Sequence, residues 1–220
     1  MKQIIYVAIV TICVMFTGCE KNETFNNIPS GEENGYDYVD LGLSVKWATC
    51  NIGAKKIEDS GFYFAWGETH SKISYVWDSY VFYEQATNSL NKYYGDDLKQ
   101  LEIIDDAVNV YMDSTWRMPT AKEFQELKDK CTWTKITING VTGYKITGRN
   151  GNAIFLPATG FKGKEPFQLL SPNGGYYWTS TLDIEHCYKA IANVFGPHTS
   201  DYYVDKNYRY YGYAIRPVCP

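Results

Sequence analysis

The segment Trp116–Pro157, WRMPTAKEFQELKDKCTWTKITINGVTGYKITGRNGNAIFLP, carries the clearest local signals in the chain. Thr120 precedes Glu123 by three residues, which is the spacing of a capping box. Each of these two side chains can bond a backbone N–H that the first turn of a helix leaves unsatisfied. Apolar residues then recur at helical spacing as far as Cys131. The segment therefore predicts a helix that begins directly after Thr120.

Three short segments after this helix predict a tight antiparallel meander. Thr132–Ile138 is rich in β-branched residues, and Asn139-Gly140 matches a type I′ turn, in which both central residues need positive φ. Tyr144–Gly148 and Ala153–Pro157 follow, separated by a second Asn-Gly pair. We therefore predict an α+β fold of antiparallel sheets with one or two helices and long loops.

The composition indicates an aromatic-rich globular domain. The chain has 220 residues, of which 45% are hydrophobic and 16% aromatic, including 20 Tyr and 6 Trp. This length suits one domain with an appendage. The net charge is −4, and no basic patch interrupts the sequence. Nucleic acid is therefore not an expected partner, because binding to phosphates requires clustered Lys and Arg.

The N-terminal residues have the features of a targeting segment. A Lys near the start precedes the apolar run Ile4–Phe16, which is short for a membrane span and typical of a signal peptide. Small residues directly before Cys19 resemble a bacterial lipobox, which implies cleavage after Gly18 and lipidation of Cys19. The alternative is an ordinary secretory peptide with an incidental Cys.

These features divide the chain into three parts. Residues 1–18 are expected to be a lipoprotein signal peptide, and Cys19–Gly35, which is polar and lacks apolar periodicity, a disordered tether. Tyr36–Pro220 is the expected folded domain. The lipid on Cys19 would hold this domain at a membrane.

Four cysteines remain in the predicted domain: Cys50, Cys131, Cys187 and Cys219. An even number in an exported protein predicts two disulfides, with three possible connectivities. The alternative is that they are free buried thiols. Their spacings match no zinc pattern, so we expect no metal and no cofactor.

The motifs together resemble the Fibrobacter succinogenes major paralogous domain family, found in lipoproteins of Bacteroidetes. The matching segments cover almost all of Tyr36–Pro220 and are as follows: Tyr38–Leu43, Lys46–Ala54, Phe64–Thr69, Trp116–Thr120, Cys131–Thr134, Asn150–Pro157, Gly175–Ser180 and Ile215–Val218.

This resemblance implies a C-type lectin-like fold and a lipid-anchored protein exposed on the outer membrane. It implies non-catalytic recognition of a glycan or a surface protein, as in an adhesin. Two alternatives remain: a structural subunit of an envelope or fimbrial assembly, and a degenerate relative of the formylglycine-generating enzymes, which share this fold.

Few residues favour calcium binding or catalysis. Calcium-dependent lectins of this fold use Glu-Pro-Asn and Trp-Asn-Asp motifs, whereas this chain has Phe167 after Glu165-Pro166 and Thr179 after Trp178. Most oxygen ligands of that site are therefore missing. The three His residues fit no catalytic pattern, so we expect no enzyme activity.

A Tyr-rich segment near the C-terminus is the candidate ligand-binding surface. The candidate residues alternate with charged and amide side chains and comprise Tyr202, Tyr203, Tyr208, Arg209 and Tyr210. Tyr offers a large contact area at a low entropy cost, which suits recognition. The alternative is an ordinary strand with Tyr on its wet face. Tyr213 alternates with Ile215 and is expected in the core.

Five Trp residues of the matched motifs are expected in the core as well: Trp47, Trp66, Trp116, Trp133 and Trp178. Arg117 and Arg216 are expected to form a buried ion pair or to bind carbonyl oxygens.

Overall fold

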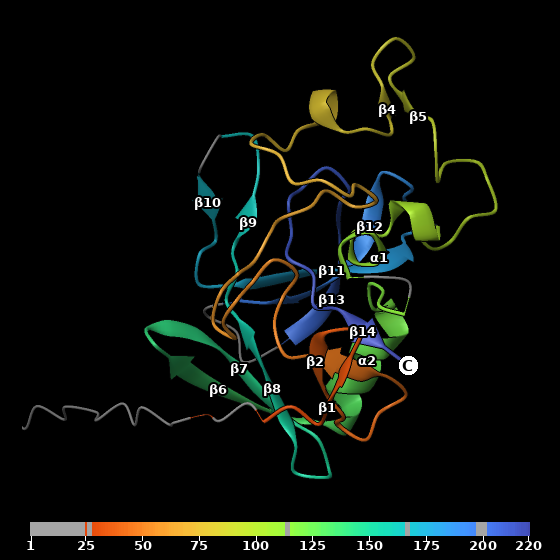
Figure 1. The fold of residues 1–220 in the computed structure, drawn as a ribbon. Helices are drawn as coiled ribbons and strands as arrows, with labels where there is room; N and C mark the ends of the chain where they lie inside the picture. Colours follow the sequence, from red (N-terminus) through yellow and green to blue (C-terminus); the bar gives the residue numbers. More distant parts are fainter. Residues whose placement is uncertain (1–24, 26–27, 113–114, 166–167, 197–201) are drawn as a thin grey trace, which may run out of the picture.

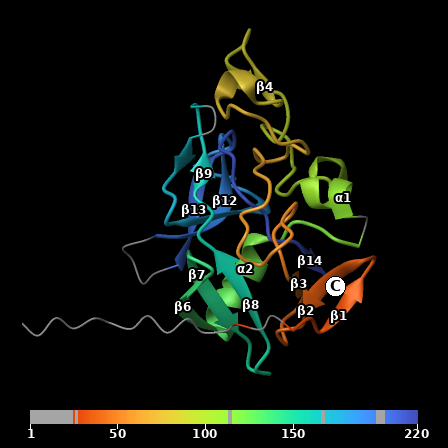
Figure 2. The same cartoon turned by 60° about the vertical axis from the view of Figure 1, so that its left-hand side comes forward.

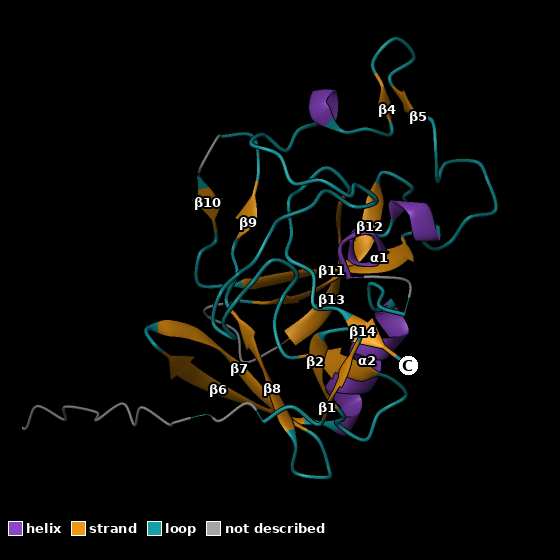
Figure 3. Cartoon of the chain, in the orientation of Figure 1, coloured by secondary structure: helices purple, strands orange, loops and turns teal. Residues whose placement is uncertain are grey.

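The computed structural model describes Phe25 and residues 28–112, 115–165, 168–196 and 202–220. Short antiparallel sheets form most of the regular structure, and the described residues contain two α-helices (Figures 1 and 3). The predicted α+β organisation with long loops is therefore confirmed. The predicted signal peptide and Cys19 lie outside the described residues. Within the described residues, no helix is long and apolar enough to cross a membrane.

The predicted helix is α2, which spans Ala121–Lys130. The Oγ1 atom of Thr120 accepts a hydrogen bond from the backbone N–H of Glu123 at 3.2 Å. The Glu123 carboxylate accepts one from the backbone N–H of Thr120 at 2.7 Å. The capping box is therefore formed as predicted. Phe124 and Leu127 are the buried residues of this helix.

The meander after α2 consists of β6 (Thr132–Ile138), β7 (Val141–Thr147) and β8 (Ala153–Pro157), paired in that order. Asn139 and Gly140, which connect β6 to β7, have φ values of 49° and 83°. Both values are positive, as a type I′ turn requires. Because this turn has only two residues, β7 starts directly after it and includes residues that the sequence analysis left out.

A second sheet joins the two ends of the domain in the order β1-β2-β3-β14. Its strands are β1 (Gly31–Glu33), β2 (Tyr36–Val39), β3 (Lys46–Ala48) and β14 (Val218–Cys219). The terminal strand lies beside the N-terminal strands at the lower right of Figure 1.

The strand β1 corrects the predicted tether, because disorder as far as Gly35 is wrong for this segment. Asn34 and Gly35 have φ values of 49° and 82°, so β1 and β2 form a hairpin around a two-residue turn. This Asn-Gly pair is the same signal as the one at Asn139, and the sequence analysis missed it. The ordered sheet therefore begins at Gly31.

The third sheet contains β11 (Gly175–Leu182), β12 (Lys189–Phe195) and β13 (Tyr202–Tyr208), all antiparallel. Part of the chain between Trp66 and α2 extends above the sheets as a loop-rich insert in both views (Figures 1 and 2). The remaining elements are short and comprise η1 (Trp77–Ser79), β4 (Tyr83–Glu84), β5 (Ser89–Leu90), η2 (Ile103–Asp105), α1 (Ala107–Met112), β9 (Phe161–Lys162) and β10 (Leu169–Leu170).

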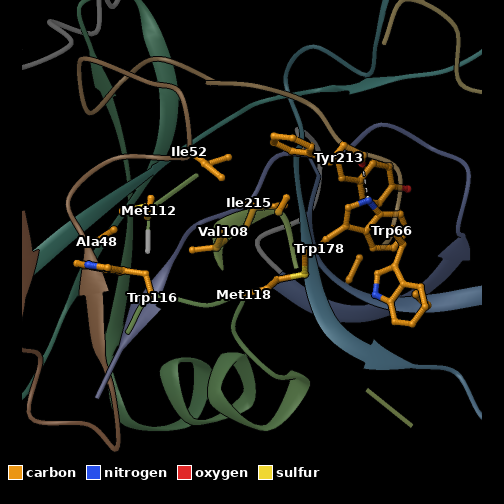
Figure 4. Close-up of a cluster of buried hydrophobic side chains, with 14 of the residues drawn as sticks. Ala48, Ile52, Trp66, Val108, Met112, Trp116, Met118, Trp178, Tyr213 and Ile215 are labelled. Carbon is orange, nitrogen blue, oxygen red and sulfur yellow. Dashed lines mark hydrogen bonds between the residues drawn. The ribbon is translucent and has the colours of Figure 1, made fainter. Parts of the chain in front are cut away.

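Large aromatic residues fill the cores between these elements, as predicted for four of the five Trp residues. Trp66, Trp116 and Trp178 belong to one core, part of which is drawn in Figure 4. Trp47 belongs to a second core with Phe124 of α2. The exposed fraction of each of these four indole side chains is 0%. The fifth, Trp133, is only half-buried at the edge of the second core.

The four cysteines do not form the two predicted disulfides, and this prediction is wrong. Cys50, Cys131, Cys187 and Cys219 are free thiols. Cys219 lies in the core of Trp178, and Cys131 lies against the core of Trp47 at the end of α2. Spacing along the sequence cannot decide whether two cysteines approach closely enough to form a bond.

Candidate recognition surface

The most prominent surface cluster of aromatic rings is centred on Trp77 of η1. Ring centroids of five Tyr residues lie 4.8–6.1 Å from that of Trp77. Tyr80 is the buried base of this arrangement, with an exposed fraction of 2%. The other members are only partly buried or exposed, and we call them the Trp77 cluster: Trp77, Tyr83, Tyr188, Tyr208 and Tyr210.

The Trp77 cluster offers accessible ring surface. The exposed fraction of Tyr208 is 42%, and its ring stacks on that of Tyr210 at a centroid distance of 5.6 Å and an angle of 12°. Polar groups border these rings. The Nζ atom of Lys189 lies 5.3 Å from the centroid of the Tyr208 ring. The hydroxyl of Tyr83 donates to Oδ1 of Asn88 at 2.5 Å.

The backbone around residue 209 explains why Tyr208 and Tyr210 reach the cluster together. Tyr208 ends β13, and the backbone N–H of Tyr211 donates to its carbonyl at 3.1 Å, so residues 208–211 form a turn in which the rings of Tyr208 and Tyr210 stack. The backbone N–H of Arg209 donates to the carbonyl of Tyr188 at 3.1 Å, and that of Trp66 donates to the carbonyl of Arg209 at 2.8 Å. These bonds fix the segment between two neighbours.

Arg209, a predicted ligand-binding residue, is buried, and this prediction is wrong. The exposed fraction of its side chain is 0%. Its guanidinium donates to the Tyr80 hydroxyl at 2.8 Å and to the carbonyls of Cys187, Lys92 and Tyr93 at 3.1, 3.2 and 3.4 Å. Its donors are therefore directed at the protein itself.

An aromatic cage surrounds the same guanidinium. The ring centroids of Trp66, Tyr80, Tyr93 and Phe82 lie 4.9, 5.3, 5.5 and 5.7 Å from its central carbon atom. Within the described part of the chain, no carboxylate forms an ion pair with Arg209. Arg209 therefore anchors the loop-rich insert to the sheet through neutral acceptors and cation–π contacts.

The structure places Tyr202 and Tyr203 away from the Trp77 cluster. Tyr202 stacks on Trp133 at a centroid distance of 3.9 Å and lies against the second core, so it packs β13 onto the meander. Tyr203 is exposed, with a fraction of 42%, but it lies near the opposite end of β13 from Tyr208. Of the four predicted Tyr residues, Tyr208 and Tyr210 therefore belong to the Trp77 cluster, whereas Tyr202 and Tyr203 lie outside it.

The sequence analysis missed Trp77, which lies in a stretch rich in Tyr, Ser and Asn. A usable signal was present, because Trp77, Tyr80 and Tyr83 repeat every three residues. A spacing of three matches the repeat of a 3₁₀-helix, although η1 itself ends at Ser79 and Tyr83 belongs to β4. The contribution of Tyr188 from the start of β12 depends on tertiary structure alone.

One group of possible cation ligands occurs among the described residues, formed by Asp183, Glu185 and His186. The Nζ atom of Lys206 lies 3.2 Å from Oδ1 of Asp183 and 2.5 Å from Oε2 of Glu185. The single Lys ammonium therefore already pairs with both carboxylates, one of them on the buried Asp183, and the arrangement is that of an ion-pair network.

The remaining chemically interesting residues have structural surroundings. Burial raises the pKa of the Cys219 thiol, which opposes formation of a nucleophilic thiolate. Arg117 forms an ion pair with Glu123, but its side chain is 41% exposed, so this pair is not buried as expected. Arg216 is buried and donates to the Asn51 side chain and to backbone carbonyls, including that of Phe155 at 2.8 Å.

No protein-family model, no curated protein and no solved structure matches this chain.

Proposed function

We propose that this protein is a lipid-anchored lipoprotein of the outer membrane that recognises a glycan or a surface protein without catalysis. The Trp77 cluster is the observation that carries this proposal. It presents aromatic rings from three separate parts of the chain, and polar groups border them. Aromatic faces pack against the apolar C–H faces of sugar rings and against apolar side chains, while polar neighbours fix orientation.

Rigid support favours a binding role for these rings. The buried guanidinium of Arg209 bonds Tyr80 beneath the cluster and the carbonyl of Cys187 beside Tyr188. A surface whose side chains are already ordered loses less conformational entropy when it binds. Preorganised aromatic residues are therefore suited to recognition.

The family proposal rests on the resemblance to the Fibrobacter succinogenes major paralogous domain and its C-type lectin-like fold. Pairing of β14 with β3 is compatible with it, because the two ends of a lectin-like domain lie together. The lipobox resemblance around Cys19 supports the lipid anchor. Folds of this kind host unrelated sites, so the function is argued from the Trp77 cluster.

A structural role in an envelope assembly is the second candidate, and one feature favours it. β13 lies at the end of its sheet and pairs only with β12 among the described strands. An open strand edge can accept a strand from another subunit. Chemical crosslinking of cells would then trap the chain in large homo- or hetero-oligomers.

A glycan and surface-protein binding array tests the recognition proposal. The full chain in detergent should bind at least one glycan or protein, and Trp77→Ala should abolish that binding. Tyr203→Ala is the control, because it removes an exposed aromatic ring that lies outside the cluster. Tyr203 is as exposed as Tyr208, at 42%, but only Tyr208 contacts Trp77. Equal binding by wild type and Trp77→Ala would refute the role of the cluster.

Cell fractionation tests the anchor separately. Cys19→Ala should release the protein from the membrane fraction, because the polar segment after Cys19 has no other means of insertion. Retention of this variant in the membrane at the wild-type level would contradict lipidation at Cys19.

A further inference from the structure

A cavity of about 350 Å³ lies in the insert, and none of its lining residues belongs to the Trp77 cluster. Its lining combines two carboxylates, a lysine and apolar side chains. The residues are Gly67, Glu68, Thr69, His70, Ser71, Lys72, Ser79, Val81, Phe82, Ile104 and Asp105. We call it the Glu68 cavity. Its volume falls in the range of small-molecule sites.

Glu68 has one carboxylate oxygen that is not used by the protein. The side chain is buried, with an exposed fraction of 8%. Its Oε1 atom accepts hydrogen bonds from Nζ of Lys72 at 2.7 Å and from the backbone N–H of Val81 at 2.9 Å. From the described residues, Oε2 accepts no hydrogen bond. Among the described residues, the fully buried side-chain polar atoms without a partner are Trp47 Nε1 and Asn193 Nδ2, so Oε2 of Glu68 is accessible to a ligand in the cavity.

The backbone before Glu68 is built to place this side chain. Its N–H donates to the carbonyl of Ala65 at 3.0 Å, which closes a tight turn. Gly67 in this turn has a φ of 79°, and a Cβ atom there would lie 2.7 Å from the Phe82 ring. Only glycine fits both the left-handed conformation and the close approach.

Asp105 provides a second free oxygen in the same cavity. Its Oδ2 atom accepts from Nζ of Lys92 at 2.6 Å and from the Tyr93 hydroxyl at 2.5 Å. Its Oδ1 atom accepts no hydrogen bond within the described part of the chain. The exposed fraction of the Asp105 side chain is 13%. The cavity therefore presents two carboxylate acceptors on separate segments.

The charges of the cavity favour a neutral ligand. Each carboxylate is already paired with a lysine, Glu68 with Lys72 and Asp105 with Lys92. A cationic ligand would meet the ammonium of Lys72, which lines the cavity, and an anionic ligand would meet the carboxylates. Hydroxyl groups instead can donate to the free carboxylate oxygens in strong, charge-assisted hydrogen bonds.

Apolar side chains at the same cavity supply an apolar contact surface. Val81 and Ile104 are exposed, with fractions of 60% and 68%, and the Phe82 ring lies beside them in the lining. A ligand with several hydroxyls and an apolar face of C–H groups matches both features. That description fits a sugar residue.

The cavity walls are held in place from beneath. Arg209 bonds the Tyr80 hydroxyl on one side and the carbonyls of Lys92 and Tyr93 on the other. Tyr80 precedes Val81, and Lys92 and Tyr93 both bond Asp105. Fixing both walls lowers the entropy cost of binding.

We propose that the Glu68 cavity binds one neutral sugar residue, with Oε2 of Glu68 and Oδ1 of Asp105 accepting hydrogen bonds from its hydroxyls. This proposal does not depend on binding at the Trp77 cluster. Failure of either site leaves the other testable, since no residue of the Trp77 cluster lines the Glu68 cavity.

Saturation-transfer NMR of the full chain in detergent provides the test. The probes are methyl glycosides of neutral hexoses, 6-deoxyhexoses, pentoses and N-acetylhexosamines. At least one should bind with a Kd of about 1 mM or lower. Glu68→Gln should weaken binding about tenfold or more, because a neutral amide is a poorer acceptor than a carboxylate. Glu84→Gln, the same change on the exposed β4, should bind like wild type.

A second variant keeps the test decisive if Glu68→Gln disturbs folding. Ser71 is exposed and lines the cavity, so Ser71→Trp should fill it without altering a core. This variant should lose binding while its melting temperature stays unchanged. The proposal is overturned if no glycoside binds, if Ser71→Trp binds like wild type, or if Ca²⁺ or putrescine competes with the sugar for the cavity.

Discussion

Replacement of Arg209 by Ala should destabilise the protein strongly, although the sequence places this residue in a polar, Tyr-rich run. Three of its four side-chain hydrogen bonds are 3.2 Å or shorter. A hydrogen bond that involves a charged group contributes about 1.5–3 kcal/mol. The low end of this range over three bonds gives about 4.5 kcal/mol.

Two further effects act in opposite directions. Removal of a buried charge recovers part of its desolvation cost, whereas the carbonyls of Lys92 and Cys187 lose their partner and the side chain leaves a void. Truncation of one partner in a buried charged network typically costs about 3–5 kcal/mol. We therefore expect a loss of about 4 kcal/mol, or a fall in Tm of roughly 8–16 °C for a domain of this size.

Urea unfolding followed by Trp fluorescence measures this loss. Hydrogen exchange should show faster exchange of the amides between Tyr80 and Tyr93, because Arg209 ties that segment to the sheet. Arg209→Met retains the aliphatic stem and should be less destabilising than Arg209→Ala. Lys122→Met, on the exposed side of α2, should unfold like wild type. A loss below about 1 kcal/mol for Arg209→Ala, with unchanged exchange, would refute the anchoring role.

Two further outcomes follow from burial and charge. Tyr213→Ala should cost about 3–5 kcal/mol, because the ring is 1% exposed and stacks on Trp178 at 4.3 Å, whereas Tyr208→Ala should cost under about 1 kcal/mol. Equal losses of unfolding free energy in the two variants would contradict the division between core and surface. Burial alone would raise the pKa of Glu123, but hydrogen bonds from Arg117 and the helix N-cap outweigh it and hold this pKa below its usual value. Its stabilising effect is therefore complete above the unfolded pKa of about 4.3 and is lost as the pH falls through the lower folded pKa. Stability of Glu123→Gln should depend less on pH below about 5, and an unchanged profile in acid titrations of unfolding would argue against this linkage.

The sequence by itself determined those elements whose signals are local. The capping box at Thr120 and the Asn139-Gly140 turn each depend on residues within four positions of one another, and both form as predicted. The Asn34-Gly35 hairpin shows the same rule, since its signal was present but was not used. Burial of large Trp residues was also predictable, because these side chains have the largest apolar area to remove from water.

Tertiary structure alone decided the surroundings of the residues that matter for binding. The Arg209 guanidinium is stable in the interior because backbone carbonyls and aromatic rings from positions 66–93 surround it. These positions are more than a hundred residues away in the sequence. Trp77 meets Tyr188 and Tyr208 for the same reason. Cys131 and Cys219 remain apart because they pack against different cores. Contacts between distant segments depend on how the sheets and insert pack as a whole, and the local pattern of a single segment does not contain that information.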